Sequence, residues 1–392
     1  MKIAVIGAGI SGLTFAAAMQ RFSPETQVEL YERDQSLTSR PQGYSLGLKG
    51  DMGLAVLKAL GLYEHLAQEM YTITNFVFCN QRGQHLLELP ETGDEKRLTQ
   101  RVKRQSLKMA LLEAVHETPL HFGRHCTGYR QQAEGIEVHF EGGTRAQADY
   151  LIACDGSLSA LRHQLIGDKR HYLGLTSIFC ETSVLIQHPL LQGGYFMTLG
   201  DDGSSIFCYR QPEDIHLSYT VHAKSETELS AQAPVELLHR VQQATKTWHA
   251  PIPELVTAID LASVEVRGYY DKEPITRVRE GQLWLIGDAA HPMAPYQGQG
   301  ANLAMVDALQ LAQYFAGLVS IPGQAEAKAK TLEEQIITRG RKAVLDSRAA
   351  ARRFHETNRL QQRWRNASLR IGNLFIRGFS RRGAPSEQGQ YR

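Results

Sequence analysis

The sequence predicts an α/β protein in which a domain with a parallel β-sheet is interleaved with a second domain built on an antiparallel sheet. Residues 2–31 alternate strand, glycine turn, helix and strand, which is the pattern of a β-α-β unit. Residues 173–267 instead carry longer runs of alternating apolar and polar residues, as antiparallel strands do. A continuous apolar run at residues 283–286 then returns to the pattern of a buried parallel strand.

We therefore expect the chain to pass between the two domains more than once. The expected ranges are residues 1–72, 95–170 and 270–330 for the first domain and residues 73–94 and 171–269 for the second. Arginine-rich helices at 331–380 are predicted to brace the two domains, and 381–392 to form a flexible tail. The apolar and basic residues of this terminal segment form an amphipathic pattern, so attachment to a membrane surface is the alternative.

The composition favours a small-molecule partner. The 392 residues are 42% hydrophobic and carry a formal net charge of +2, too weak a field to indicate nucleic acid or an anionic membrane as the main partner. The five cysteines are scattered without a Cys-x-x-Cys pair, which predicts free thiols in a cytoplasmic protein and no metal site. No apolar run reaches the roughly 18 residues of a spanning helix, so we expect no transmembrane segment. Monomer and homodimer both stay open.

A glycine-rich turn, Gly7-Ala8-Gly9-Ile10-Ser11-Gly12, follows the first strand. Gly7 permits the tight turn, Gly9 lets a pyrophosphate approach the backbone, and Gly12 lets the helix pack closely on the strand. Glu32 ends the next strand, where its carboxylate can accept both ribose hydroxyls of an adenosine. The combination predicts a Rossmann-like dinucleotide site, and a purely structural glycine turn is the alternative.

A later motif favours FAD over NAD. Gly287-Asp288 follows the buried strand, and an aspartate there can bind ribityl hydroxyls, which a nicotinamide dinucleotide lacks. The segment Gly298-Gln299-Gly300-Ala301-Asn302 opens a helix, whose start carries about half a positive charge. That charge would stabilise the anionic edge of a reduced flavin. A solvated aspartate in a glycine-rich connection is the alternative.

Between these motifs, the buried strand at 150–154 ends in Asp155-Gly156, and Arg162 follows in the helix that this turn starts. In isolation this is an ordinary turn signal. Taken together and in this order, the three motifs resemble the para-hydroxybenzoate hydroxylase family of single-component FAD-dependent monooxygenases, over essentially residues 1–330. Within the family, the chain's size, the Glu32-Arg33-Asp34 run and the segment from Gly287 to His291 look similar to the tetracycline-inactivating and small aromatic hydroxylase branches. Gly47 departs from the tetracycline-inactivating pattern, in which an aspartate can follow the arginine that Arg40 matches.

The resemblance implies roles for residues that match the family's motifs. The glycine turn and Glu32 would bind the ADP half of FAD, and Gly287 and Asp288 its ribityl chain. The other cofactor-binding positions are expected to be Arg33, Arg40, Arg104, Asp155, Gly156, Arg162, Gly298, Gly300, Ala301 and Asn302. The resemblance also implies that NADPH or NADH reduces FAD and that O2 then forms a flavin C4a-hydroperoxide, which hydroxylates an aromatic or polyketide-like molecule.

Two regions are expected to control the reaction. The loop at 292–298 carries two prolines, and Pro295 and Gly298 are predicted to form a stiff wall that keeps water from the reactive ring. Substrate contacts are expected from the antiparallel domain, with Arg210 either anchoring an acidic group or lying at a strand end. The candidate substrate residues are Phe196, Phe207, Tyr209, Arg210, Tyr219 and His222. Each of these side chains could instead belong to the core of the sheet.

Three alternatives concern the activity itself. A flavin-dependent halogenase needs a Trp-x-Trp-x-x-Pro signature, which three widely spaced tryptophans do not supply. A flavoprotein reductase or oxidase would lack oxygen transfer. In a non-enzymatic redox sensor, bound FAD would serve only as a ligand.

Overall fold

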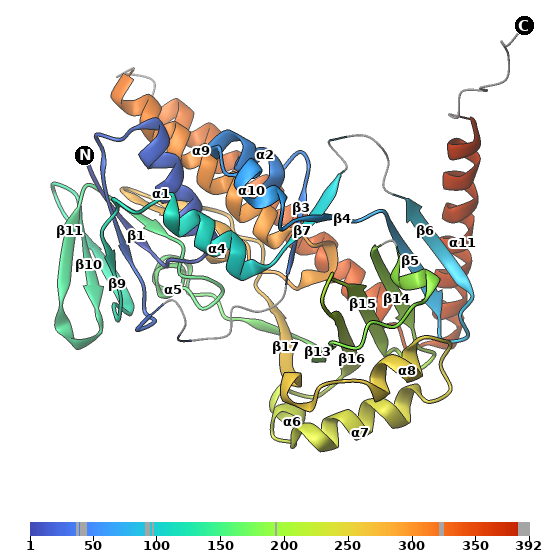
Figure 1. Ribbon diagram of the computed structural model, residues 1–392. Coiled ribbons are helices and arrows are strands. Elements are labelled where there is room, and N and C mark those ends of the chain that lie inside the picture. Colours follow the sequence, from blue (N-terminus) through green and yellow to red (C-terminus); the bar gives the residue numbers. More distant parts are fainter. Residues whose placement is uncertain are drawn as a thin grey trace, which may run out of the picture. The chain divides into compact units, whose positions relative to one another are not determined.

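The computed structural model describes residues 1–36, 39, 45–90, 95, 98–192, 194–320 and 325–382. The chain divides into two compact units. Unit 1 comprises Met1–Thr72, Gly93–Leu173 and Tyr270–Ala351, and unit 2 comprises Ile73–Thr92, Gly174–Tyr269 and Arg352–Arg392. Figure 1 shows the elements of both units along the chain.

The main sheet of unit 1 has six strands. Their order is β18 (Arg279–Glu280), β19 (Leu283–Leu285), β12 (Tyr150–Ala153), β1 (Lys2–Ile6), β2 (Gln27–Tyr31) and β8 (Leu120–His121). All neighbours pair in parallel except β18 and β19. The inner strands are apolar on both faces because helices and a second sheet cover them, which agrees with the continuous apolar runs in the sequence.

Helices and two small sheets complete unit 1. The helices are α1 (Ile10–Phe22), α2 (Gly53–Leu60), α3 (Tyr63–Ala67), α4 (Arg104–Glu113), α5 (Ala160–Ile166), α9 (Gly300–Ser320) and α10 (Ala325–Phe354). The small sheets are β9 (Cys126–Gln131), β10 (Ile136–Phe140) and β11 (Arg145–Ala148), and β3 (Leu46–Lys49), β4 (Tyr71–Thr72) and β7 (Thr99–Val102). Helices α1 and α9 pack along each other, so the two glycine-rich helix starts belong to one layer.

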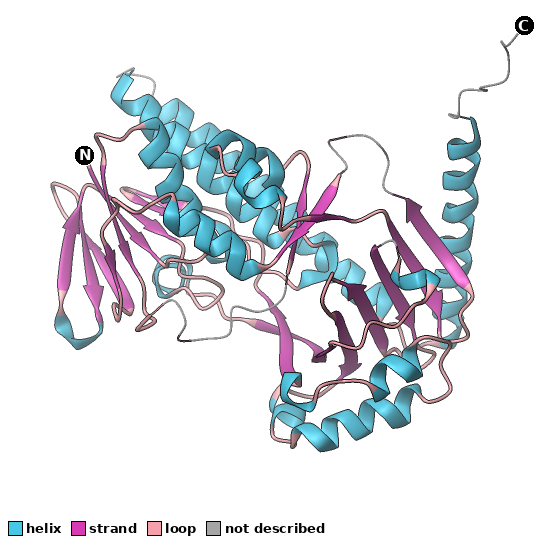
Figure 2. Cartoon of the chain, viewed as in Figure 1, coloured by secondary structure: helices cyan, strands magenta, loops and turns pink. Residues whose placement is uncertain are grey.

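Unit 2 is built on a seven-stranded sheet, shown in magenta in Figure 2. Its order is β17 (Glu265–Asp271), β13 (His171–Thr182), β16 (Ile215–His222), β15 (Ser205–Arg210), β14 (Gly194–Leu199), β5 (Asn75–Asn80) and β6 (His85–Pro90). The strands pair antiparallel from β13 to β14, whereas β14 and β5 run parallel. Its helices are α6 (Thr227–Ser230), α7 (Pro234–Thr245), α8 (Ile252–Thr257) and α11 (Arg359–Arg382).

The predicted fold class is confirmed: a parallel-sheet part is interrupted along the chain by a part with a mainly antiparallel sheet. Each unit has its own apolar core. Phe15, Leu151 and Trp284 belong to that of unit 1, and Phe196 and Leu217 to that of unit 2. Among the helices of the described residues, none has the length and apolar character to cross a bilayer.

Candidate functional site

The first glycine turn leaves open space at the start of α1. Gly7 has a φ of +101°, and a Cβ there would lie 2.4 Å from the Cys154 carbonyl oxygen. A Cβ on Gly12 would lie 2.0 Å from the Gly7 carbonyl oxygen, so both positions exclude a side chain. A Cβ on Gly9 would meet nothing within 4 Å. Because no side chain among the described residues caps α1, its first N–H groups can bind an anion in that space.

Glu32 holds its carboxylate beside this turn. Its Oε2 accepts a hydrogen bond from the Ala8 N–H at 2.8 Å, and its Oε1 accepts one from the Asp34 N–H at 3.0 Å. These two bonds fix the carboxylate at the carboxyl end of β2, next to the open space at Gly9. An adenosine ribose bound to the turn would meet a fixed acceptor there. The neighbouring Arg33 is exposed.

Asp155 brings an unsatisfied acceptor to the same edge of the sheet. It follows β12, and Gly156 allows the turn with a φ of +81°. The Asp155 Oδ2 accepts from the Ala160 N–H at 3.0 Å, while Oδ1 is buried with no partner among the described residues. Burial raises the pKa of this carboxyl. Buried acceptors are rarely left unpaired, so a ligand donor fits this atom.

Asp288 follows β19 in the sequence and lies close to the start of α9 in space. Gly287 makes the turn with a φ of +59°, and a Cβ on Gly300 would lie 3.8 Å from the Asp288 Oδ1. The Asp288 side chain is exposed, yet enough protein surrounds it that desolvation raises the pKa of its carboxyl. The charges of His291 and Arg104 oppose that increase. The charge of Arg104, the exposed first residue of α4, thus lowers the pKa of a carboxyl group 184 positions further along the chain.

Asn302 fixes the start of α9. It is fully buried, and its Oδ1 accepts from the N–H groups of Lys49 (2.9 Å) and Gly53 (3.1 Å). Its Nδ2 donates to the carbonyl oxygens of Gly47 (2.9 Å) and Gly298 (3.0 Å). Its side-chain amide is therefore engaged in hydrogen bonds to the protein backbone. The backbone N–H groups in the first turn of α9, including those of Gly300 and Ala301, are what this helix can offer to a cofactor.

The loop before α9, residues 292–298, is anchored to α10. Pro295 begins a single 3-10 turn, Pro295–Gln297, and Gly298 ends it with a φ of +57°. The Ser347 Oγ donates to the Ala294 carbonyl oxygen at 2.6 Å, which ties the loop to α10. Pro295 and Gly298 are both exposed, as a wall facing a bound molecule must be before that molecule binds.

Arg162 lies inside the protein. Only 1% of the residue is exposed, and its guanidinium donates to Asp168 and to the carbonyl oxygens of Ala290 (2.5 Å) and Glu273 (2.8 Å). These bonds hold the segment after Asp288 in place. The structure thus gives this arginine a positioning role and does not present it to a ligand.

A buried ionic network lies behind the Gly287–Asp288 turn. The His291 Nε2 and the Asp307 Oδ2 are 2.6 Å apart, and the Arg339 Nε lies 2.7 Å from the Asp307 Oδ1. Burial alone would lower the pKa of His291, but the charge of Asp307 and the bond to it raise that pKa. Burial would raise the pKa of Asp307, and His291 and Arg339 together lower it. Asp307 and Arg339 belong to none of the motifs recognised in the sequence, so neither residue was predicted.

One face of the unit 2 sheet carries a row of aromatic side chains. Phe76 on β5, Tyr195 on β14 and Phe207 on β15 are half-buried and lie 5.3 to 5.9 Å apart between ring centroids. Tyr209 continues the row and stacks on His216 of β16, with centroids 4.9 Å apart and an angle of 9° between the planes. We call these five residues the aromatic face. Tyr209 and His216 are buried, so this face offers a planar ligand the half-buried rings of Phe76, Tyr195 and Phe207.

The predicted substrate residues do not all lie on this face. Strand alternation places Phe207 and Tyr209 on the aromatic face, whereas Phe196, Arg210 and Tyr219 point to the opposite side of the sheet. There Phe196 and Tyr219 are buried in the core that includes residues of α7 and α8. Their placement supports the alternative that they are core residues. Arg210 is half-buried at the end of β15.

His222 and Arg40 complete the predicted positions. His222 ends β16 and is exposed, and its Nε2 lies 2.7 Å from the His355 carbonyl oxygen. That contact ties β16 to the segment before α11. Arg40 lies outside the described residues, so its predicted role stays a prediction.

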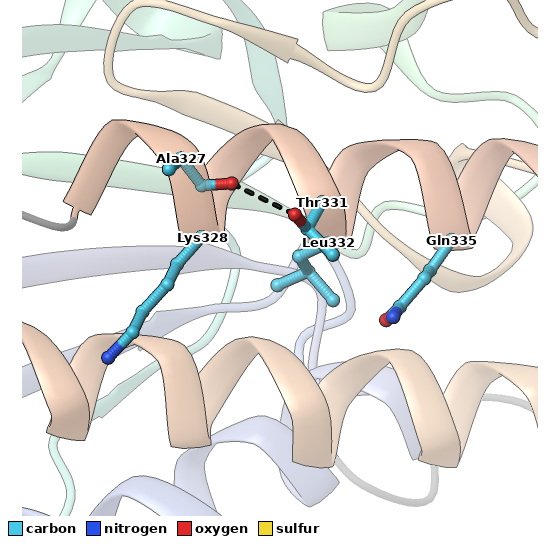
Figure 3. Close-up of a pocket in the computed structure, with 5 residues that line it drawn as sticks. All are labelled: Ala327, Lys328, Thr331, Leu332 and Gln335. Atoms are coloured by element: carbon cyan, nitrogen blue, oxygen red, sulfur yellow. Dashed lines mark hydrogen bonds between the residues drawn. The ribbon is translucent and has the colours of Figure 1, made fainter.

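A separate hollow of about 300 Å³ lies along the first turns of α10. Figure 3 shows its lining, in which Lys328, Leu332 and Gln335 point towards a neighbouring helix and Thr331 donates to the Ala327 carbonyl oxygen. These five described lining residues include one cation and no carboxylate or histidine. They give no reason to place the functional site here.

Comparison with known proteins identifies the family of this arrangement. The family model described as "FAD binding domain" matches residues 1–368. A 3-amino-4-hydroxybenzoate 2-monooxygenase of Streptomyces platensis is 28% identical over 388 residues, covering 94% of this chain and 92% of that protein. An FAD-dependent urate hydroxylase of Klebsiella pneumoniae is 27% identical over 354 residues, covering 89% of each chain.

Solved structures share the fold. The crystal structure of Klebsiella pneumoniae HpxO with FAD and uric acid has a TM-score of 0.83 and 24% identity, covering 96% of this chain and 95% of that one. The tetracycline destructase Tet(51) has a TM-score of 0.64 and 18% identity, covering 100% of this chain and 99% of that one. The sequence-based resemblance to aromatic and tetracycline-inactivating flavoprotein hydroxylases is confirmed at the level of family and fold.

Proposed function

This chain belongs to the FAD-binding domain family, and from that premise we propose that it is an NAD(P)H-dependent monooxygenase that hydroxylates a small aromatic molecule. FAD dependence and membership among aromatic monooxygenases are shared with its relatives. The electron donor, the substrate and the site residues are the parts that we propose. Bound FAD would supply the redox chemistry, accepting a hydride from the nicotinamide and passing one oxygen atom of O2 to the substrate.

The proposal rests on the proximity of Asp288 to the start of α9. An aspartate at the end of a parallel strand can accept the ribityl hydroxyls of FAD, and a helix N-terminus can stabilise the negative charge of the reduced ring. Gly9, Glu32 and Asp155 add an anion cradle and two acceptors at the carboxyl end of the same sheet. These groups fit FAD better than they fit a nicotinamide dinucleotide.

The aromatic face supports the choice of substrate class. Its partly exposed rings suit stacking with a planar molecule, and the names of two relatives specify aminohydroxybenzoate and urate as their substrates. We propose a planar, electron-rich ring of similar size. Arg210 lies on the other side of the sheet from Phe207, so we do not retain it as an anchor on that face.

The remaining expectations stay proposals as well. Pro295 and Gly298 are proposed to limit access of water to the flavin ring, because both are exposed on a loop that Ser347 anchors. All five cysteines are buried free thiols, which fits the expected reducing cytoplasm. O2 is the expected co-substrate, and the chain is expected to be a monomer or a homodimer.

A two-part assay tests the proposal. The purified yellow protein would be screened with aminohydroxybenzoates, urate, phenols, quinolones and tetracyclines for stimulation of NADPH and NADH oxidation. Mass spectrometry would then look for one added oxygen atom, supplied from isotopically labelled O2. Stimulated oxidation with labelled product is expected. Oxidation that yields only hydrogen peroxide would favour an oxidase or reductase, and the absence of any turnover would favour a redox sensor.

A further inference from the structure

The outer face of α11 carries an exposed apolar stripe. Leu360, Trp364, Ile371, Leu374 and Phe375 are between 55% and 72% exposed, although large apolar side chains usually avoid water. Their spacing of three, four and seven residues places them on one side of the helix. Single exposed apolar residues are ordinary, but a continuous row over four turns indicates an interaction surface.

The opposite face of α11 belongs to unit 2. Leu369 packs in a small core with Phe78 and Met197. The Asn373 Oδ1 accepts from the Glu88 N–H at 3.1 Å, and the Gln362 Nε2 donates to the Asp201 carbonyl oxygen at 3.1 Å. In Figure 1, α11 runs beside β6. These contacts fix the rotation of the helix, so the apolar stripe points away from the sheet that it covers.

Charge decides which partner the stripe suits. Residues 359–382 contain seven arginines and no aspartate or glutamate, although the whole chain has a net charge of only +2. Arg359 and Arg363 are exposed beside the stripe, and Arg370, also exposed, has its guanidinium 2.8 Å from the Gln84 Oε1. A row of apolar side chains bordered by arginines matches the boundary between the headgroups and acyl chains of an anionic bilayer.

The same charges disfavour a second copy of the chain. With Ala367 filling its one gap, the stripe from Leu360 to Leu374 has the alternating four- and three-residue spacing of a helix-pairing seam, and Arg363 and Arg370 flank it seven residues apart. In an antiparallel pair these flanking arginines would face one another. In a parallel pair, Arg363 and Arg370 would face Ser368 and Phe375, which bring no opposite charge.

We propose that α11 lies flat on an anionic lipid surface and holds the protein there as a peripheral membrane protein. The apolar stripe would enter the boundary of the acyl chains, while the arginines would contact phosphate groups. This inference does not depend on the proposed enzymatic function. The contacts that α11 makes within unit 2 use its inner face, so lipid contact at the outer face would leave them in place.

Vesicle flotation tests the proposal with the intact holoprotein. One set of vesicles would be pure phosphatidylcholine and the other equimolar phosphatidylcholine and phosphatidylglycerol. We expect flotation only with the anionic set, and weaker flotation as salt is raised. Of the three tryptophans, Trp248 and Trp284 are buried, so a blue shift of fluorescence on binding would report Trp364.

Two variants and two controls separate the contributions. Trp364→Ser combined with Leu374→Ser should lower the partition coefficient at least tenfold, because both side chains would leave the acyl boundary. Arg359→Gln combined with Arg363→Gln should lower it by about fivefold for each arginine. The matched controls on α7, Val235→Ser and Arg240→Gln, replace exposed residues and should leave binding unchanged. FAD absorbance and the melting temperature would confirm that every variant is folded.

Three other outcomes would each overturn the proposal. Failure of the wild-type protein to float with either set excludes the lipid surface, and equal flotation with both sets excludes recognition of anionic lipid. Concentration-dependent dimerisation that the Trp364→Ser and Leu374→Ser changes abolish, without vesicle binding, would assign the stripe to a second copy of the chain.

Discussion

His291 and Asp307 form a buried ion pair directly behind the turn that presents Asp288. The two side chains are at most 1% exposed, and Nε2 and Oδ2 are 2.6 Å apart. The same Asp307 oxygen accepts from the Gly287 N–H at 3.2 Å. One carboxylate on α9 thus holds both the turn and the histidine that follows it. The pair therefore positions the turn that carries a candidate cofactor residue.

We expect Asp307→Asn to destabilise the protein by about 3 kcal/mol, because removing one partner of a buried pair leaves the other uncompensated. Thermal unfolding followed by flavin fluorescence would measure this change. Asp346→Asn is the control, since its carboxylate pairs with Lys342 on the surface and should matter little. An Asp307→Asn protein as stable as wild type would show that the network does not hold the turn.

The same pair should make stability depend on pH. Because folding raises the pKa of His291, this residue stabilises the folded protein fully at pH values below its unfolded pKa of about 6.5. That stabilisation is lost as the pH rises through its pKa in the folded protein. Because folding lowers the pKa of Asp307, this residue stabilises the folded protein fully at pH values above its unfolded pKa of about 3.9. That stabilisation is lost as the pH falls through its pKa in the folded protein. The difference in melting temperature between wild type and Asp307→Asn should therefore be largest between about pH 4 and 6.5 and narrow above that range. A difference independent of pH would contradict an ionic pair.

Two glycines of one motif should respond differently to the same substitution. A Cβ on Gly9 meets no atom within 4 Å, and its φ of −80° suits any residue, so Gly9→Ala should leave the apoprotein stable. The new methyl group would occupy the space beside α1 that a pyrophosphate needs, and FAD affinity should fall tenfold or more. Gly12→Ala would instead place its Cβ 2.0 Å from a backbone oxygen and should destabilise the fold itself. Fluorescence titration with FAD and apoprotein melting curves would distinguish these effects. Unchanged FAD affinity in Gly9→Ala would place the pyrophosphate elsewhere.

The sequence predicts the local elements of unit 1 well because their signals are local. The strand, glycine turn and helix at residues 2–22 follow from apolar runs and glycine spacing, and the strand expected at 283–286 is found as β19 (Leu283–Leu285). Each pattern depends on neighbours within a few positions, and those neighbours are visible in the sequence.

Relationships between distant residues were not predictable in this way. Nothing in the sequence pairs Asp307 with His291 across two elements, or turns Arg162 inward to hold Ala290. The alternation along β14 and β15 separates Phe196 from Phe207, but it does not say which face packs against α7 and α8. Phe76 joins the aromatic face only because β5 pairs with β14, which is 119 positions further along the chain. These features depend on tertiary pairing.

Asp288→Asn should weaken FAD binding at least tenfold while leaving the apoprotein intact. A carboxylate accepts hydrogen bonds from ribityl hydroxyls more strongly than an amide does. Because desolvation raises the pKa of Asp288, a neutral amide should be tolerated in the apoprotein at neutral pH. Wild-type affinity for FAD should also fall as pH decreases through that raised pKa, whereas the affinity of the variant should vary less. Titration of both apoproteins over a pH series would show this. Equal affinities at neutral pH would remove Asp288 from the cofactor site.

The two faces of the unit 2 sheet provide the sharpest test of where substrate binds. Phe207→Ala removes a half-buried ring from the aromatic face, so we expect a small loss of stability and a clearly higher KM for the aromatic substrate. Phe196→Ala removes a ring that is 0% exposed in the core and should destabilise the protein by about 3–5 kcal/mol. At temperatures where it stays folded, its KM should remain close to that of wild type. Steady-state kinetics and melting curves for both variants would decide the matter. A KM that rises for Phe196→Ala and not for Phe207→Ala would move the substrate to the opposite face of the sheet.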